Sequence, residues 1–343
     1  MELTKLWHLL TFYLSTIQAV FRDIFSGLLY LNRTLSVLVM DKFLSLYFKS
    51  CDLSPCTIDL DNQTTMHFWS TNHRRFNKPI LVMLHGYGSN SKWQFLYQVN
   101  SLSRSFNLYV PDLLFFGKSY TNLLDRTDGF QARCVVRGLE RLGVDRFSVY
   151  GLSYGGFVAY RMAEMYPEVV EKVVIVSSGV GCTRDQKGEH LRKVGRRASD
   201  ILVPNNPRDL RLLVNLSMHK HEAFKWFPDF LLQQFVNVMY KDHRKEKIEL
   251  IEYLLEKETV SNLPVLTQET LIIWGDKDNV FPVQFAHQLH RYHLGPKSRL
   301  EIIKDTGHAA NMESPDAVNR SIKSFVLGTP DSLHSLGNLC KQS

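Results

Sequence analysis

A serine, an aspartate and a histidine occur in the order that nucleophilic catalysis requires. Ser153 lies in Gly151-Leu152-Ser153-Tyr154-Gly155, directly after the apolar run 147–150 and directly before a helix-like segment at 157–164. A strand, a serine and a helix in this order form a nucleophile elbow, a sharp turn that presents the hydroxyl at the end of a sheet. The glycines allow the strand and the helix to approach closely. We therefore predict that Ser153 is a nucleophile.

A serine hydroxyl needs a base that accepts its proton and an acid that orients the base. Asp276 and Asp278 follow the apolar run 271–274, and His308 follows the apolar run 300–303. The chain order of serine, acid and histidine, each after a strand, predicts that His308 is the base. Both aspartates are candidates for the acid.

An early glycine-rich turn supplies candidate donors for an oxyanion. The apolar run 79–84 ends in His85-Gly86-Tyr87-Gly88-Ser89. An oxyanion hole needs two backbone N–H groups aimed at the developing negative charge. We assign the N–H of Tyr87 and the N–H of Tyr154, the residue after the nucleophile, to this role. His85 is interpreted as a residue that braces the turn.

These residues resemble the α/β-hydrolase superfamily, and the chain is most similar to the plant monoacylglycerol-lipase-like α/β-hydrolases. The resemblance spans roughly residues 50–328. The matching segments are His85-Gly86-Tyr87-Gly88, the run from Val110 to Tyr120, Gly151 to Phe157, Trp274-Gly275-Asp276-Lys277-Asp278 and Thr306-Gly307-His308.

The resemblance carries two implications for the site. In the family's Trp-Gly-x-x-Asp pattern the second acid belongs to the triad, which selects Asp278 over Asp276. Epoxide hydrolases and haloalkane dehalogenases share the fold but attack with an aspartate, whereas this chain has Ser153 at that position. The resemblance therefore implies a serine hydrolase.

Strand-like and helical runs alternate over residues 79–180 and 269–328. This alternation predicts an α/β fold with a mostly parallel central sheet flanked by helices. The predicted core comprises residues 51–182 and 261–328. Between them, residues 183–260 show apolar residues at helical spacing and are predicted to form an inserted helical cap. Its aromatic residues are expected to fill the cap interior, and some of them to line an acyl pocket.

The first 50 residues form an apolar N-terminal segment. Residues 6–21 contain no Asp, Glu, Lys or Arg, but the run is shorter than the ~20 residues of a spanning helix. Three interpretations remain open: an amphipathic or re-entrant membrane anchor, a helical element packed on the core, and a cleaved signal peptide. The expected location is the cytoplasm or an intracellular membrane such as the endoplasmic reticulum. Residues 329–343 are predicted to form a tail.

The composition adds exclusions. The five cysteines are scattered and odd in number, so neither a disulfide framework nor a zinc site is predicted. We expect no cofactor, no metal and no nucleic acid as a partner, because no matching motif occurs. The formal net charge is +7. The basic residues at 241–247 are interpreted as a solvated helical face, with attraction to an anionic membrane as the alternative.

The sequence thus predicts a cofactor-independent serine hydrolase that cleaves carboxylic esters, either a carboxylesterase or a monoacylglycerol-lipase-like enzyme. The expected partner is a small-molecule ester or lipid, with peripheral membrane association through the N-terminal segment. Two alternatives remain open: a ligand receptor that retains the triad, and a carbon–carbon bond hydrolase.

Overall fold

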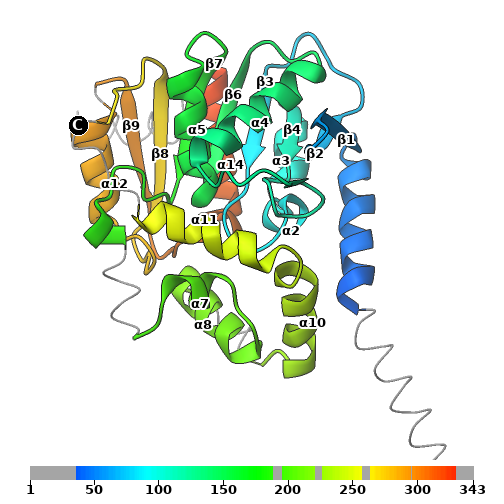
Figure 1. Cartoon of the computed structure of the whole chain (residues 1–343). Coiled ribbons are helices and arrows are strands. Elements are labelled where there is room, and N and C mark those ends of the chain that lie inside the picture. Colours follow the sequence, from blue (N-terminus) through cyan, green and yellow to red (C-terminus); the bar gives the residue numbers. More distant parts are fainter. Residues whose placement is uncertain (1–35, 188–194, 221–225, 257–262, 295, 330–343) are drawn as a thin grey trace, which may run out of the picture.

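The structure is a computed structural model that describes residues 36–187, 195–220, 226–256, 263–294 and 296–329. A nine-stranded sheet forms its centre, with strand order β1-β2-β4-β3-β6-β7-β8-β9 and β5 paired to β2 (Figure 1). The sheet is parallel from β4 to β9, and β2 runs antiparallel to its three partners. The strands are β1 (Leu53–Asp61), β2 (Thr64–Thr71), β3 (Ile80–Leu84), β4 (Asn107–Pro111), β5 (Tyr120–Thr121), β6 (Phe147–Leu152), β7 (Val170–Val176), β8 (Glu269–Gly275) and β9 (Ser298–Ile303).

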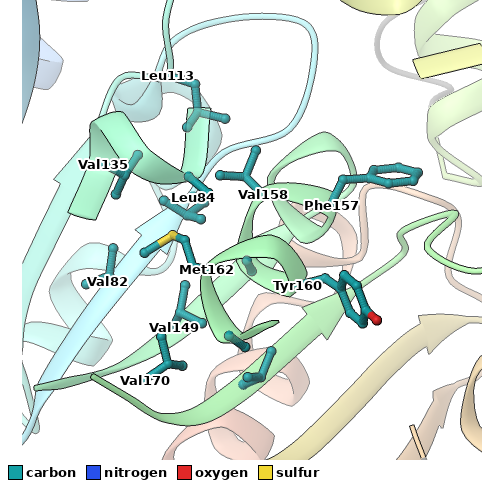
Figure 2. Close-up of a cluster of buried hydrophobic side chains, with 14 of the residues drawn as sticks. Val82, Leu84, Leu113, Val135, Val149, Phe157, Val158, Tyr160, Met162 and Val170 are labelled. Carbon is teal, nitrogen blue, oxygen red and sulfur yellow. The ribbon is translucent and has the colours of Figure 1, made fainter. Parts of the chain in front are cut away.

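Helices cover both faces of the sheet because its central strands are apolar on both sides. Val82 and Leu84 of β3 point to one hydrophobic cluster, and Leu81 and Met83 point to the other. Figure 2 shows part of the first cluster, where side chains of α5 pack on the strands. The first face carries α4 (Asp128–Arg141), α5 (Tyr154–Met165) and α12 (Gln284–Gln288); the second carries α3 (Val99–Ser103), α14 (Pro315–Leu327) and the helical residues 36–50. The predicted α/β fold is confirmed.

The described residues between β7 and β8 form helices and turns, without a strand in 195–220 or 226–256. The helices α7 (Ala198–Leu202), α8 (Pro207–Ser217), α10 (Asp229–Tyr240) and α11 (Arg244–Glu256) are called here the helical insert. Their apolar side chains share one cluster, and they gather at one end of the sheet (Figure 1). Asn206 is the N-cap residue directly before α8, and its side chain accepts the N–H of Asp209.

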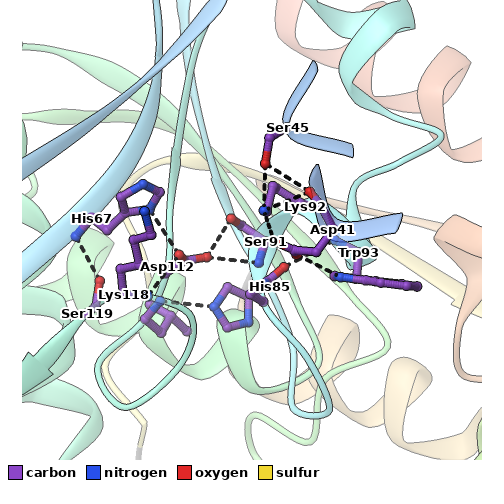
Figure 3. A network of polar contacts seen from close by, with 12 residues as sticks. Asp41, Ser45, His67, His85, Ser91, Lys92, Trp93, Asp112, Lys118 and Ser119 are labelled. Carbon is purple, nitrogen blue, oxygen red and sulfur yellow. Dashed lines mark hydrogen bonds and ion pairs between the residues drawn. The ribbon is translucent and has the colours of Figure 1, made fainter. Parts of the chain in front are cut away.

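The helix at residues 36–50 packs on both parts of the molecule. Phe48 is fully buried against the sheet, and Val37 belongs to the cluster of the helical insert. Asp41 binds the ammonium of Lys92 at 2.6 Å and the indole N–H of Trp93 at 3.0 Å (Figure 3). The remaining parts of the predicted N-terminal segment and tail, 1–35 and 330–343, lie outside the described residues. No helix in the described part of the chain is long and apolar enough to cross a membrane.

Lys247 departs from the prediction of a solvated basic face. Its side chain is buried, and its Nζ donates to the carbonyls of Met239 and Asp242 at 2.8 and 2.7 Å. These carbonyls lie at the C-terminal end of α10, where helical carbonyls lack intrahelical partners and favour a cation. Burial lowers the pKa of Lys247 to about 8. The spacing of charges along the sequence did not distinguish this lysine from its exposed neighbours.

Candidate active site

Ser153 lies at the tight turn between β6 and α5. Its backbone has φ 50° and ψ −113°, a strained conformation of the kind found at functional sites. A Cβ placed on Gly155 would lie 2.2 Å from the carbonyl oxygen of Leu84, and one on Gly151 would lie 2.3 Å from that of Gly155. Both positions therefore require glycine, and the strand, turn and helix predicted around Ser153 are present.

Ser153, His308 and Asp278 form one chain of hydrogen bonds. His308 Nε2 lies 2.9 Å from Ser153 Oγ, and His308 Nδ1 lies 2.9 Å from Asp278 Oδ2. The other carboxylate oxygen, Oδ1, accepts the backbone N–H groups of Val280 and Phe281, each at 2.8 Å. These two bonds fix the plane of the carboxylate. The arrangement allows His308 to accept the proton of Ser153 while Asp278 holds the other ring nitrogen protonated.

Asp276, the other candidate acid, has a different position. Its Oδ1 accepts the N–H of Thr306 at 3.4 Å, and its Oδ2 lies 3.4 Å from Lys277 Nζ. It therefore joins the loop after β8 to the loop after β9, and it makes no hydrogen bond to His308. The structure places Asp278 beside the histidine, as the resemblance implied.

The turn at residues 85–89 lies against the nucleophile. A Cβ placed on Gly86 would approach the Cβ of Ser153 to 3.0 Å. Tyr154 is the first residue of α5, where N–H groups have no intrahelical acceptor. Within the described residues, neither the N–H of Tyr87 nor that of Tyr154 donates a hydrogen bond. Both groups are available to a ligand oxygen beside Ser153.

His85 braces this turn, as interpreted from the sequence. Its Nε2 accepts the N–H of Leu113 at 2.9 Å, so the proton of the neutral ring is on Nδ1, which donates to the carbonyl of Gly86 at 2.7 Å. The ring is fully buried, and burial lowers its pKa. A neutral imidazole with both nitrogens engaged connects the loop after β3 to the loop after β4.

Gln94 holds the same turn from another direction, and the sequence did not reveal it. Its Oε1 accepts the N–H of Gly86 at 2.8 Å and its Nε2 donates to the Gly86 carbonyl at 2.9 Å. Asn311 Nδ2 in turn donates to the backbone carbonyl of Gln94 at 2.7 Å, and Gln98 Nε2 donates to that of Asn311 at 2.7 Å. This chain of buried amides joins the turn to the segment that follows His308. Single glutamines carry no local sequence signal, so only the fold identifies them.

Asp112, in the matched segment from Val110 to Tyr120, is the centre of a second buried network (Figure 3). It accepts the N–H and Oγ of Ser91 at 3.0 and 2.6 Å, His67 Nδ1 at 3.0 Å and the N–H of Lys118 at 3.3 Å. It makes no contact with Ser153 among the described residues. Its role is to join the loops beside the site.

A cavity opens above Ser153 and encloses about 660 Å³ of space free of protein atoms, its opening to solvent included. Aliphatic side chains of the helical insert form one wall, with aromatic rings of the core opposite. The described lining comprises Tyr87, Ser153, Tyr154, Phe157, Lys187, Leu202, Leu213, Ser217, Ile251, Leu254, Leu255, Val280, Phe281 and His308.

The expectation that some aromatic residues of the insert line the cavity is not met. None of those among the described residues lines the cavity, and Trp226 is 86% exposed. Of the aliphatic wall residues, Leu202, Leu213, Ile251 and Leu255 belong to the hydrophobic cluster of the insert, and Leu254 packs on the first cluster of the sheet. No group of three or more His, Cys, Asp or Glu side chains within the described ranges could hold a metal ion.

Comparison with known proteins agrees with this architecture. The chain is 26% identical over 258 residues to a 2-hydroxy-6-oxononadienedioate/2-hydroxy-6-oxononatrienedioate hydrolase of Pseudomonas sp, a match that covers 72% of this chain and 87% of that protein. It is 26% identical over 281 residues to monoacylglycerol lipase ABHD6 of Mus musculus, covering 79% and 81%. The crystal structure of a membrane phospholipase A, a bacterial virulence factor, aligns with a TM-score of 0.73 and 21% identity over 90% of this chain and 96% of that one. Identity this low shows the shared fold alone. Residues 79–315 match the model of the alpha/beta hydrolase fold, and the chain belongs to that family.

Proposed function

We propose that the protein is a serine hydrolase that cleaves carboxylic esters with an apolar acyl group. The observation that carries this proposal is the hydrogen-bonded chain from Ser153 through His308 to Asp278 at the floor of an apolar cavity. Lipases among the proteins of similar sequence support the ester as substrate class.

The proposed reaction has two halves. Ser153 Oγ attacks the ester carbonyl carbon while His308 Nε2 takes its proton, and the N–H groups of Tyr87 and Tyr154 bind the resulting oxyanion. The intermediate collapses, the C–O bond to the alcohol breaks, and His308 gives its proton to the departing oxygen. A water then attacks the acyl-enzyme with His308 as base, and the acid and free Ser153 are released. The chain needs no cofactor for these steps.

The cavity favours a substrate with one long apolar arm. The insert side of the cavity is hydrocarbon except for Ser217, its other described lining residues being Leu202, Leu213, Ile251, Leu254 and Leu255. Each buried methylene of an acyl chain contributes about 0.8 kcal/mol. This wall and the similarity to the monoacylglycerol lipase of Mus musculus support a monoacylglycerol as the finer substrate proposal. We further propose that the helical insert acts as a cap over the bound acyl chain.

A carbon–carbon bond hydrolase is the second candidate, because the Pseudomonas relative is named for a 2-hydroxy-6-oxo-dienedioate substrate. Such a substrate carries two carboxylates. The described cavity wall is mostly apolar, with Lys187 as its one cation among the described lining residues. This composition suits an acyl chain better than a dianion.

The test is steady-state hydrolysis of p-nitrophenyl esters from acetate to palmitate and of a monoacylglycerol, with the Ser153→Ala variant as the blank. We expect turnover that depends on Ser153 and increases with acyl length. A ring-fission diketo acid assayed in parallel would identify the second candidate. Folded protein that labels with a fluorophosphonate but turns over no ester would refute ester hydrolysis and favour the receptor alternative.

We also propose that the protein associates peripherally with lipid surfaces through its N-terminal segment. The helix at residues 36–50 follows the uncharged run 6–21 in the chain. Its outer face shows large apolar side chains that are 37–60% exposed: Leu38, Val39, Met40, Phe43 and Leu46. An amphipathic helix of this kind buries its apolar face at the membrane interface. Full-length protein should co-sediment with phosphatidylcholine vesicles, and a Phe43→Ser, Leu46→Ser variant should bind less; equal binding would contradict this role for the helix.

A further inference from the structure

The side chain of Tyr87 contacts both the sheet and the helical insert. Its ring packs edge-to-face on Phe116, with ring centroids 5.0 Å apart, and on Tyr154 at 5.7 Å. Its Oη donates a hydrogen bond to the backbone carbonyl of Lys247 in α11. Burial raises the pKa of Tyr87, so the phenol keeps its proton and acts as the donor. Tyr87 is thus packed against the hydrophobic clusters of both parts.

The carbonyl that Tyr87 binds is itself held firmly. The ammonium of Lys247 donates to the carbonyls of Met239 and Asp242 at the end of α10. It also lies 5.5 Å from the centre of the Phe116 ring, the same ring that packs on Tyr87. The first turn of α11 is therefore fixed to α10 and lies over the turn that carries Tyr87.

The same helix forms part of the cavity wall. Ile251, Leu254 and Leu255 line the cavity and follow Lys247 at spacings of i+4, i+7 and i+8. These spacings place all four residues on one face of α11. One helix therefore lines the cavity with its later turns and anchors Tyr87 at its beginning.

The peptide that joins Gly86 to Tyr87 holds the Gly86 carbonyl and the Tyr87 N–H in one plane. His85 Nδ1 and Gln94 Nε2 donate to this carbonyl at 2.7 and 2.9 Å, so they hold the plane from the core side. After Tyr87 the chain continues into Gly88, whose φ of 125° is a conformation that other residues rarely adopt. On the side of the insert, the Tyr87 phenol provides the second restraint on this turn.

We propose that Tyr87 is a positioning residue whose phenol, bound to α11, orients its own backbone N–H toward the oxyanion. The position of the helical insert then determines how well the oxyanion hole is formed, and so affects kcat. This proposal rests on the proposed ester hydrolysis. A residue that only held the insert closed would affect KM instead, because it would change the binding of the ground state.

The test compares Tyr87→Phe with Tyr160→Phe. Tyr160 lies on α5 and also donates its phenol to a backbone carbonyl, that of Pro264 at 2.5 Å, away from the turn at 85–89. Tyr87→Phe should lower kcat about tenfold for every acyl length, with KM unchanged within about twofold, because one orienting hydrogen bond is lost. Affinity for a trifluoromethyl ketone, whose adduct places an oxyanion in the same hole, should decrease by the same factor. Tyr160→Phe should change neither.

Two results would overturn the proposal: an unchanged kcat in Tyr87→Phe, whether or not KM rises, or an equal loss of kcat in Tyr160→Phe. If wild-type protein hydrolyses no ester, the ester proposal fails by itself. The rate of fluorophosphonate labelling of Ser153 then decides the role of Tyr87, since the phosphoryl oxygen occupies the same hole. Labelling about tenfold slower in Tyr87→Phe supports that role, and equal rates overturn it. Wild-type protein that does not label would refute both proposals.

Discussion

The exchange Asp278→Asn tests the candidate triad most directly, because the structure determines how the new amide must lie. Asp278 Oδ1 accepts two N–H groups at 2.8 Å, those of Val280 and Phe281. The amide oxygen of the introduced asparagine must take this place, since an NH₂ group there would face two donors. The NH₂ group then points to His308 Nδ1, which has to accept. The ring proton moves to Nε2, and His308 can no longer take the proton of Ser153.

The size of the effect follows from the cost of the opposite orientation. Turning the amide leaves two buried N–H groups unpaired at about 1–3 kcal/mol each, hence about 2–6 kcal/mol in total. This cost corresponds to a loss of about 30-fold to 10⁴-fold. Where an amide imposes the wrong tautomer in a serine triad, kcat decreases by about 10⁴-fold. We therefore expect a decrease of about 10³-fold to 10⁴-fold for Asp278→Asn.

The assay is kcat for a p-nitrophenyl ester, with Ser153→Ala as the floor and Asp276→Asn as the matched control in the same loop. An asparagine at 276 still offers an oxygen to the N–H of Thr306, so this variant should keep kcat within about threefold. More than about a tenth of wild-type kcat in Asp278→Asn would refute the reasoning. So would an equal loss in Asp276→Asn, because the effect would then not be specific to the carboxylate that binds His308.

Three further predictions concern packing, pH and the cavity wall. Gly155→Ala should prevent folding to soluble protein, because the new Cβ would lie 2.2 Å from the carbonyl oxygen of Leu84. Gly129→Ala is the control, because its Cβ would have no neighbour closer than 3.8 Å. Urea titration should show that Gly129→Ala raises the free energy of unfolding by about 0.5–1 kcal/mol. The pKa of buried His85 is lowered, so below pH 6.5 the unfolded chain binds a proton that the folded chain does not. The free energy of unfolding should therefore decrease as the pH is lowered, by at most about 1.4 kcal/mol per pH unit. The free energy of unfolding of the wild type should exceed that of a His85→Gln variant by less at pH 5 than at pH 7.5. A difference that does not change with pH would contradict the neutral buried ring. Leu254→Ala should raise KM for the palmitate ester several-fold and leave the acetate ester unchanged, and equal effects on both esters would show that α11 does not contact the acyl chain.

The sequence predicted the central parallel strands and the loops after them, because such strands are buried on both faces and appear as continuous apolar runs. The hairpin of β1 and β2 escaped prediction although its alternation is visible: side chains at Cys56, Ile58 and Leu60 are more buried than those at Pro55, Thr57 and Asp59. A single exposed face made this pattern weaker than the runs of the core. The three interpretations of the N-terminal segment remain predictions for residues 1–35, which lie outside the described residues.

The residues of the candidate site were likewise only partly predictable from the sequence. The order of strands and loops indicated a histidine and two acids, and the resemblance selected Asp278 over Asp276; the hydrogen bond from His308 to Asp278 is visible only in the structure. The supports of the oxyanion turn could not be predicted, since Gln94 and Lys247 act through contacts that join distant parts of the chain. Lys247 Nζ binds carbonyls within the insert, yet its own carbonyl serves Tyr87, 160 residues earlier.

The order of the strands also has a consequence for how the protein is synthesised. Ser153 and its hydrogen-bond partner His308 are 155 residues apart, and β8 and β9, which precede the acid and the base, are the last two strands among the described residues. The chain is synthesised from its N-terminus, and a nascent chain that ends after β7 contains the serine but neither the acid nor the base. The hydrogen bonds from Ser153 to His308 and from His308 to Asp278 can therefore form only after both late loops have been synthesised.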